Sequence, residues 1–355
     1  MRTRRLITTG LAVAATTIAL TASPTNATKP GSGSSTGRAQ IFMVNPVQSS
    51  GNQHLSDAKD ADTAELAAQY TRTQLRNLDG SGTLSGKWVN VRSSTGKPAY
   101  SPTNTFIYTR DQDQFEQVMG YFWVNQAQEY LQSLGFAPGG EHRAILARPY
   151  DLRISQYGVD NSYMTSKGDY IRLGKGGVDD AEDAEVIMHE YGHAIHHDQV
   201  PGYGTSIDAG AIGESFGDYF AVSAGLAAAK QYGWPVRAEA ACPMDWDAVS
   251  YTDAPHCIRR FDRNLTLAQR RNQVHYDGQI WSQALWETRL DYVNAGLSAA
   301  AWDETLIESQ FDYAADTSFQ DAARATYLEA RARDGQAAAN LVRANFAERG
   351  ITFAV

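Results

Sequence analysis

The segment from Val186 to Ile195 constrains the fold of this chain most. It reads Val-Ile-Met-His-Glu-Tyr-Gly-His-Ala-Ile and contains the pattern His-Glu-x-x-His among apolar residues. In an α-helix, positions i and i+4 lie on one face, about 6 Å apart along the axis. His189 and His193 would therefore direct two imidazoles at one point, as a tetrahedral zinc ion requires. Glu190 would lie beside the metal, where it can act as a general base on a metal-bound water.

Two acidic residues with the same spacing as the histidines lie downstream, in the segment Gly-Glu-Ser-Phe-Gly-Asp at residues 213–218. Glu214 and Asp218 are again four residues apart and share one face of a predicted helix. The neighbouring residues are mostly apolar, so we expect these carboxylates to be buried with partners rather than to face solvent. Glu214 is the candidate third zinc ligand. Asp218 is the candidate partner for the free ring nitrogen of a zinc-binding histidine.

A histidine is the alternative third ligand. In the metzincin pattern, a Gly follows the second ligand by three residues and a His follows that Gly by three more. This chain has His196 and Gln199 at those positions, so the pattern is not met. We expect His196 and His197 to lie at or near the surface at the C-terminal end of the helix, where cations suit the helix dipole.

Hydrophobic spacing divides the chain into a β-rich part and a helical part. Apolar residues at three- and four-residue steps predict a helix over 114–134. Apolar or alternating runs predict strands at 41–44, 87–91, 143–146 and 170–173. Further helices are predicted at 211–228, 278–293, 301–312, 318–332 and 336–348. The predicted fold class is α+β, with a β-rich N-terminal lobe over 39–200 that includes the zinc helix, and a helical C-terminal lobe over 201–355.

The first 27 residues are typical of a secretory signal peptide. Arginines at the N-terminus precede an apolar run that is too short to cross a bilayer, and small residues follow it. Cleavage is expected after Ala27 or Ala22. Residues 28–38 are rich in Gly and Ser and are expected to form a flexible leader. We therefore expect a secreted, extracellular protein.

Charge and composition limit the partners of the protein. The net charge is −9, and no cluster of Lys and Arg occurs in the expected folded region, which argues against nucleic-acid binding. No segment after the signal peptide is apolar enough over a sufficient length to span a membrane. We expect a monomer that acts without a nucleic-acid or membrane partner.

Cys242 and Cys257 are the only cysteines, and they enclose a short loop. In an exported protein a disulfide is expected, rather than a zinc-binding pair or a catalytic thiol. Such a bridge would stabilise the fold by roughly 3 kcal/mol.

The complete motif is His-Glu-x-x-His followed after 20 residues by Glu-x-x-x-Asp. It resembles that of the gluzincin zinc metallopeptidases, which include the thermolysin-like and fungalysin-like secreted proteases. The segments His-Glu-Tyr-Gly-His and Gly-Ala-Ile-Gly-Glu-Ser-Phe-Gly-Asp-Tyr are most similar to the fungalysin-like enzymes, and the resemblance extends from about Phe115 to Trp286. It implies a thermolysin-like two-lobe fold with one catalytic zinc. Aminopeptidases of the clan carry Gly-x-Met-Glu-Asn, which this chain lacks, so an endopeptidase is favoured.

The resemblance also implies roles for three further residues. His275, in Val-His-Tyr-Asp-Gly-Gln-Ile-Trp, would donate a hydrogen bond to the oxyanion of the transition state. The thermolysin branch has an Asp five residues earlier, whereas this chain has Arg270, so the residue that orients His275 is not identified. Asn161 would bind the main chain of an extended substrate at an edge strand. Tyr203 is a weaker candidate for a substrate contact.

Five acidic residues precede the zinc helix: Asp179, Asp180, Glu182, Asp183 and Glu185. Carboxylates at a helix N-terminus cap the first turn and suit the helix dipole, which explains these residues without any ion. Secreted members of the family often bind calcium, so a Ca²⁺ site is the alternative. We favour capping.

These residues predict a secreted zinc-dependent endopeptidase that acts on proteins or peptides, with Glu190 as general base for a zinc-activated water. The alternative is a secreted zinc-containing binding or scaffold protein with little proteolytic activity. A positioned base and an oxyanion donor serve no purpose in a binding protein, so the presence of Glu190 and His275 favours the enzyme.

Overall fold

The computed structural model describes residues 35–93, 97–167 and 169–355. Helices make up 46% and strands 12% of the structure, so the fold is of the mixed α+β type that the sequence predicts. The predicted signal peptide and residues 28–34 of the predicted leader lie outside the described residues. Residues 35–38 correct the leader prediction. They belong to strand β1 (Ser35–Phe42), which pairs with a neighbouring strand along its length.

The strands form two small sheets. In the first, β1 lies between β2 (Tyr70–Leu78), to which it is antiparallel, and β4 (Thr105–Phe106), to which it is parallel. The second sheet has the order β3-β5-β7-β6, and only β6 runs antiparallel to its neighbour. Its strands are β3 (Val89–Arg92), β5 (Tyr150–Arg153), β6 (Tyr163–Thr165) and β7 (Tyr170–Arg172). Strand β6 is therefore an edge strand.

The strand predicted at residues 143–146 is wrong, because that segment is irregular. The carbonyl of Ile145 accepts a hydrogen bond from Gln128 Nε2, and the backbone N–H of Leu146 donates to Asp198 Oδ2. Side chains of two helices thus form the hydrogen bonds to this backbone that a neighbouring strand would have formed.

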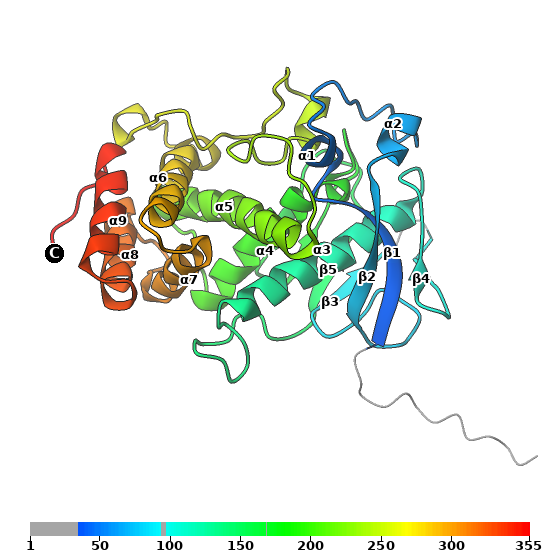
Figure 1. Ribbon diagram of the computed structural model, residues 1–355, viewed down its shortest axis with the longest axis horizontal. Coiled ribbons are helices and arrows are strands. Elements are labelled where there is room, and N and C mark those ends of the chain that lie inside the picture. Colours follow the sequence, from blue (N-terminus) through cyan, green and yellow to red (C-terminus); the bar gives the residue numbers. More distant parts are fainter. Residues whose placement is uncertain (1–34, 94–96, 168) are drawn as a thin grey trace, which may run out of the picture. The chain divides into compact units, whose positions relative to one another are not determined.

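Helices α3 (Asp113–Ser133), α4 (Ala184–Gln199) and α5 (Ile207–Tyr232) pack against one another in the middle of the fold (Figure 1). Helix α3 also lies against β1 and β3, so it joins the sheets to α4. Helix α6 (Val274–Asn294) packs along α5, and α7 (Ala299–Ser309), α8 (Phe319–Arg333) and α9 (Gln336–Glu348) follow. These helices confirm the predicted ones to within a few residues.

The remaining elements are short. They are α1 (Pro46–Ser50), α2 (Ala64–Ala67) and the 3-10 turns η1 (Asp180–Glu182), η2 (Asp247–Ser250), η3 (Leu267–Gln269) and η4 (Gln310–Asp312). From residue 201 onwards, every regular element in the described part of the chain is helical. No helix among the described residues is long and apolar enough to cross a membrane.

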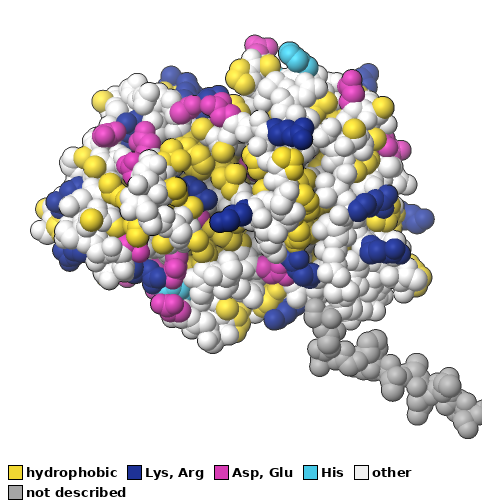
Figure 2. Space-filling model, viewed as in Figure 1, with side chains coloured by type: hydrophobic (Ala, Val, Ile, Leu, Met, Phe, Trp, Pro, Cys, Tyr) yellow, Lys and Arg dark blue, Asp and Glu magenta, His cyan; other side chains and the backbone are white. Residues whose placement is uncertain are grey.

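One main core connects the β-rich and the helical parts. The fully buried side chains of Trp123 on α3, Trp281 on α6 and Trp302 on α7 belong to the same cluster of apolar residues as those of the strands. The described residues lie in a single compact unit, and the division into two lobes stays a prediction. On the face shown in Figure 2, apolar side chains gather towards the middle, while Lys, Arg, Asp and Glu are scattered over the rest.

The predicted disulfide between Cys242 and Cys257 is confirmed, with the two Cα atoms 5.2 Å apart. The bridge closes a loop that includes η2 and leads directly into Ile258 and Arg259, both of which reach the site described below.

Candidate metal centre

The crossing of α4 and α5 requires a glycine from each helix. A Cβ atom added to Gly192 on α4 would lie 2.8 Å from the Cα of Gly217 on α5. A Cβ atom on Gly217 would lie 2.7 Å from His189 Nδ1. Real Cβ contacts are longer, so only glycine at both positions allows this approach. The glycines inside His-Glu-Tyr-Gly-His and Glu-Ser-Phe-Gly-Asp therefore bring the two motifs into contact.

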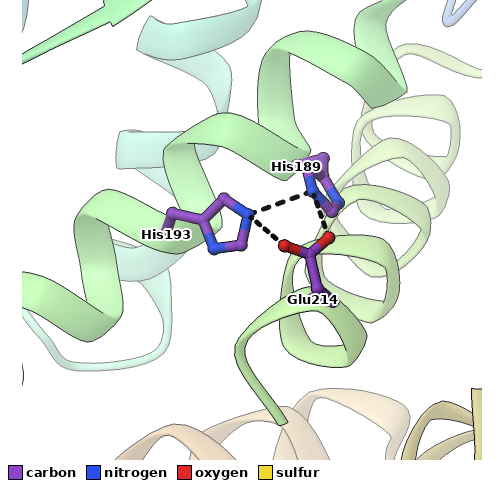
Figure 3. Close-up of side chains that lie close together, drawn as sticks. All are labelled: His189, His193 and Glu214. Atoms are coloured by element: carbon purple, nitrogen blue, oxygen red, sulfur yellow. Dashed lines mark hydrogen bonds and ion pairs between the residues drawn. The ribbon is translucent and has the colours of Figure 1, made fainter. Parts of the chain in front are cut away.

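Three side chains converge at this crossing (Figure 3). His189 and His193 point from successive turns of α4, and Glu214 points towards them from α5. The Nε2 atoms of the two histidines are 3.1 Å apart, and each lies 3.5 Å from an oxygen of Glu214. The structure thus brings together the three residues predicted as zinc ligands.

These separations fit one tetrahedral zinc ion. Zinc bonds of about 2.0–2.1 Å at tetrahedral angles place neighbouring ligand atoms about 3.3 Å apart. Glu214 Oε2 is buried and makes no hydrogen bond within the described part of the chain, although His275 Nε2 lies 3.3 Å away. A buried carboxylate oxygen without a hydrogen bond and two imidazole nitrogens are a donor set that zinc accepts.

Asp218 lies where the sequence predicts a partner for a ligating histidine. Its Oδ1 is 2.8 Å from Nδ1 of His189, and this nearby negative charge favours a ring proton on Nδ1, which would leave Nε2 free to bind a metal. Arg259 binds the same carboxylate through two hydrogen bonds, of 2.5 and 2.6 Å. Asp218 is 1% exposed, so this paired cation offsets the cost of burying its charge.

The site is electrostatically suited to positive charge. Burial lowers the pKa of His189, but Asp218 and Glu214 outweigh it and raise that pKa to about 10. Burial lowers the pKa of His193 to about 4. Burial raises the pKa of Glu214, but His193 and His189 outweigh it and hold that pKa well below its usual range. Glu214 is therefore ionised and His193 neutral, which are the states in which a carboxylate and an imidazole can bind a metal.

Glu190 lies beside the three converging residues, and it is 6% exposed. Burial raises the pKa of Glu190 to about 7, although His189 and the backbone N–H of Met164 in β6 each lower it. Its Oε2 has no hydrogen-bond partner among the described residues. A carboxylate with a pKa near neutrality and a free oxygen can accept a proton from a nearby water.

His275 reaches the site from the first turn of α6. Helix α6 approaches α5 closely at Gly278, where a Cβ atom would lie 2.9 Å from the carbonyl oxygen of Ala211. The His275 side chain is 53% exposed. Asp277, which the sequence places in the same segment, accepts hydrogen bonds from two backbone N–H groups of the preceding turn, at Arg271 and Asn272. It therefore fixes the turn that leads into the helix.

Gln273 orients His275, which the sequence did not indicate. Its Oε1 caps α6 by accepting from the backbone N–H of Tyr276, so its Nε2 is the atom that contacts His275 Nδ1, at 2.9 Å. Because an amide nitrogen only donates, His275 Nδ1 must accept, and the ring proton lies on Nε2. Arg270 instead pairs with Asp208 and lies 3.7 Å from Asp277.

A cleft of about 790 Å³ connects these residues with the edge strand. Asn161 lies on its wall just before β6, as the resemblance implies for a substrate-binding residue. Tyr203 also lines the cleft, and its hydroxyl is buried without a hydrogen-bond partner in the described part of the chain. The structure thus places both candidates at the cleft, and their substrate contacts remain proposals.

The expected surface position of His196 is wrong. This side chain is 1% exposed; it stacks on Phe216, with ring centroids 4.5 Å apart, and packs against the tilted ring of Tyr203, at 4.4 Å. Burial lowers its pKa to about 3, and neither ring nitrogen has a hydrogen-bond partner among the described residues. His196 also lines the cleft. His197 is partly exposed, as expected for the helix end.

Helix capping and the helix dipole explain two of the five acidic residues, Asp183 at the N-cap of α4 and Glu185 in its first turn. Asp183 is the N-cap and accepts from the backbone N–H of Glu185. Glu182 binds the buried Arg110 instead, and the Glu185 carboxylate accepts from the backbone N–H of Met244. The capping interpretation is therefore confirmed for Asp183 and Glu185, while Glu182 has another role as the partner of Arg110.

No protein-family model matches this chain, and no curated protein sequence matches it. Among solved structures, its fold is similar to that of the precursor of protealysin, a metalloproteinase from Serratia proteamaculans, with a TM-score of 0.54. The match covers 78% of this chain and 92% of that chain, at 15% sequence identity. At this identity the likeness concerns the fold.

Proposed function

We propose that this protein is a secreted zinc endopeptidase that hydrolyses peptide bonds in proteins or peptides. The observation that carries the proposal is the convergence of His189, His193 and Glu214 at the separations of tetrahedral zinc ligands, on the wall of a cleft that also holds Glu190. The fold similarity to a metalloproteinase precursor supports it.

The residues of the cleft have complementary tasks in peptide hydrolysis. A zinc ion held by His189, His193 and Glu214 would supply a Lewis acid and lower the pKa of a bound water. Glu190 would take a proton from the attacking water and deliver it to the leaving amine, for which a pKa of about 7 is well placed. Since Gln273 keeps the ring proton of His275 on Nε2, this atom would donate a hydrogen bond to the oxyanion.

The unpaired edge of β6 is suited to an extended peptide. An added strand there would form main-chain hydrogen bonds to β6 and run past Glu190, since Met164 of β6 lies next to that carboxylate. Recognition through the main chain favours a peptide over other substrates. Main-chain recognition also allows a peptide bond within a chain, and not only one at its end, to reach the site, as an endopeptidase requires.

Removal and return of the metal test the proposal. The mature protein should cleave casein, lose this activity after dialysis against 1,10-phenanthroline, and regain it with stoichiometric Zn²⁺. Retention of full activity in the chelated, zinc-free protein would contradict a zinc peptidase. Zinc binding at one ion per chain without cleavage of casein or a peptide library would favour the binding or scaffold protein.

A further inference from the structure

Three arginines lie next to one another on the outer face of the second sheet. Arg92 on β3 pairs in register with Arg153 on β5, which pairs in register with Arg172 on β7. Residues in register on neighbouring strands share a face, so the three side chains form a row about 10 Å wide. The buried Leu152 and Ile171 alternate with them and face the core. The arginines are far apart in sequence, so the fold gathers them.

The protein does not neutralise most of this charge. Arg92 lies 3.4 Å from Asp151, and both of these side chains are exposed. Within the described part of the chain, Arg153 and Arg172 form no ion pair and no hydrogen bond through their side chains. Like charges on neighbouring strands destabilise a sheet. The row is therefore a local excess of positive charge on a protein whose net charge is −9.

Three tyrosines hold the guanidinium groups in place. Arg153 lies over the ring of Tyr170, 3.5 Å from its centroid. Arg172 lies 5.7 and 5.8 Å from the ring centroids of Tyr157 and Tyr163. A guanidinium that stacks on an aromatic ring keeps its charge, and the N–H groups at its edge stay available to an acceptor. Because their rotamers are already restricted, these arginines lose less entropy when they bind an anion.

The row leads to the cleft. Tyr163 on the edge strand β6 pairs in register with Arg172, so it extends the row by one strand. Tyr163 also lines the cleft, and the next residue, Met164, lies beside Glu190. A peptide that adds a strand to β6 would therefore pass the end of the arginine row.

We propose that Arg153 and Arg172 bind acidic side chains of a polypeptide, beside the segment that occupies the cleft. Guanidinium groups with free N–H edges bind carboxylates through two parallel hydrogen bonds. In an extended peptide, side chains two residues apart share a face and are about 7 Å apart, so a Glu-x-Glu segment can reach both arginines. That this polypeptide is a substrate rests on the proposed function, whereas the binding itself does not.

A polypeptide fits this surface better than other polyanions do. The row ends at β6, an edge strand whose free N–H and C=O groups pair with the main chain of a peptide. A sulfated polysaccharide or a nucleic acid has no such backbone, so it would use only the arginines.

Fluorescence anisotropy tests the binding without any need for turnover. The full mature protein carries Glu190→Gln and one equivalent of Zn²⁺, so that the probe is not cleaved. Two labelled peptides are compared, one with the segment Glu-Thr-Glu-Thr-Glu and the other with Gln at the three Glu positions. We expect the Glu peptide to bind about 10-fold or more tightly at low salt, and this preference should decrease as NaCl is added.

Substitutions in the row identify the surface. Arg153→Gln and Arg172→Gln should each weaken binding of the Glu peptide by about 3- to 10-fold and leave the Gln peptide unaffected. Arg324→Gln removes the same charge from an exposed position on α8 and should bind as the parent does. The thermal midpoint of each variant shows whether it is folded. Arg172→Lys, which keeps the charge but not the paired hydrogen bonds, should have an intermediate affinity.

Equal affinities for the Glu and Gln peptides would overturn the proposal, as would unchanged binding of the Glu peptide by folded variants at both arginines. Single-stranded DNA and dextran sulfate are tested as competitors. If either binds more tightly than the Glu peptide and loses its affinity in the same variants, the assignment to a polypeptide is overturned. None of these readouts measures cleavage, so failure of the arginine row is distinct from failure of the proposed peptidase.

Discussion

The two walls of the cleft are built differently. On the helical wall, His189 and His193 are aligned by their spacing along α4, and Glu214 faces them from α5, a second regular helix. On the loop wall, Asp160 and Arg259 come from irregular segments that only the fold brings to the site. The difference suggests that the helical wall supplies the chemistry, while the loop wall orients it and receives the substrate.

Loss of a ligand on the helical wall should have the largest effect. Glu214→Ala removes the carboxylate that faces both histidines, so zinc affinity should fall by well over about 100-fold, and activity should be lost. Asp218→Ala, which removes only the partner of His189 Nδ1, should cost about 10–100-fold in zinc affinity. Competition with a chromophoric chelator measures both. Equal affinities for the two variants would contradict the assignment of Glu214 as a ligand.

Residues at the start of α6, on another side of the cleft, should affect turnover rather than metal binding. His275→Ala should lower kcat by about 100- to 1000-fold, as for other oxyanion donors, with zinc content unchanged. Gln273→Glu places a hydrogen-bond acceptor at His275 Nδ1 and draws the ring proton away from Nε2, so it should lower kcat in the same direction but less. Steady-state kinetics on a quenched peptide distinguish these effects. Zinc loss from either variant would contradict the assignment of His275 to turnover and not to metal binding.

Close packing of the helical wall can be tested with two alanines on the same helix. Gly217→Ala puts a Cβ atom 2.7 Å from His189 Nδ1 and should destabilise the protein by about 1–3 kcal/mol while weakening zinc binding. Gly225→Ala meets its nearest atom, of Val44, at an ordinary 3.6 Å and should stabilise α5 by up to about 1 kcal/mol. Urea unfolding and zinc titration measure the pair. A harmless Gly217→Ala would contradict the role of the helix crossing.

Protonation of the buried His196 should make the stability of the protein depend on pH. Burial holds the pKa of His196 at about 3, well below the usual value near 6.5, so the folded state resists its protonation. The stability that depends on neutral His196 is complete above pH 6.5 and is lost as the pH falls towards 3. Relative to His196→Phe, which keeps the stacking on Phe216, the wild type should lose about 2 kcal/mol between pH 7.5 and pH 5. Parallel pH profiles of the two proteins would contradict this.

The contrast between the helical wall and the loop wall also explains which contacts could be predicted from the sequence. Periodicity identifies α3 and α5, and the spacing of four residues places His189 with His193 and Glu214 with Asp218, because helix geometry is local. The sequence does not indicate that Arg259 binds Asp218, which is 41 residues away, since that contact depends on the whole loop. His196 illustrates the same limit: its burial depends on Phe216 and Tyr203, which reach it from outside α4.

Peptide hydrolysis by the zinc-loaded wild type and by zinc-loaded Glu190→Gln tests the central claim most directly. Zinc content and cleavage of an internally quenched peptide are measured on the same samples. The account predicts one zinc ion per chain in both proteins, with cleavage by the wild type and a loss of several orders of magnitude in the variant. Comparable cleavage by Glu190→Gln, or its absence from a wild type that holds its zinc, would contradict the account.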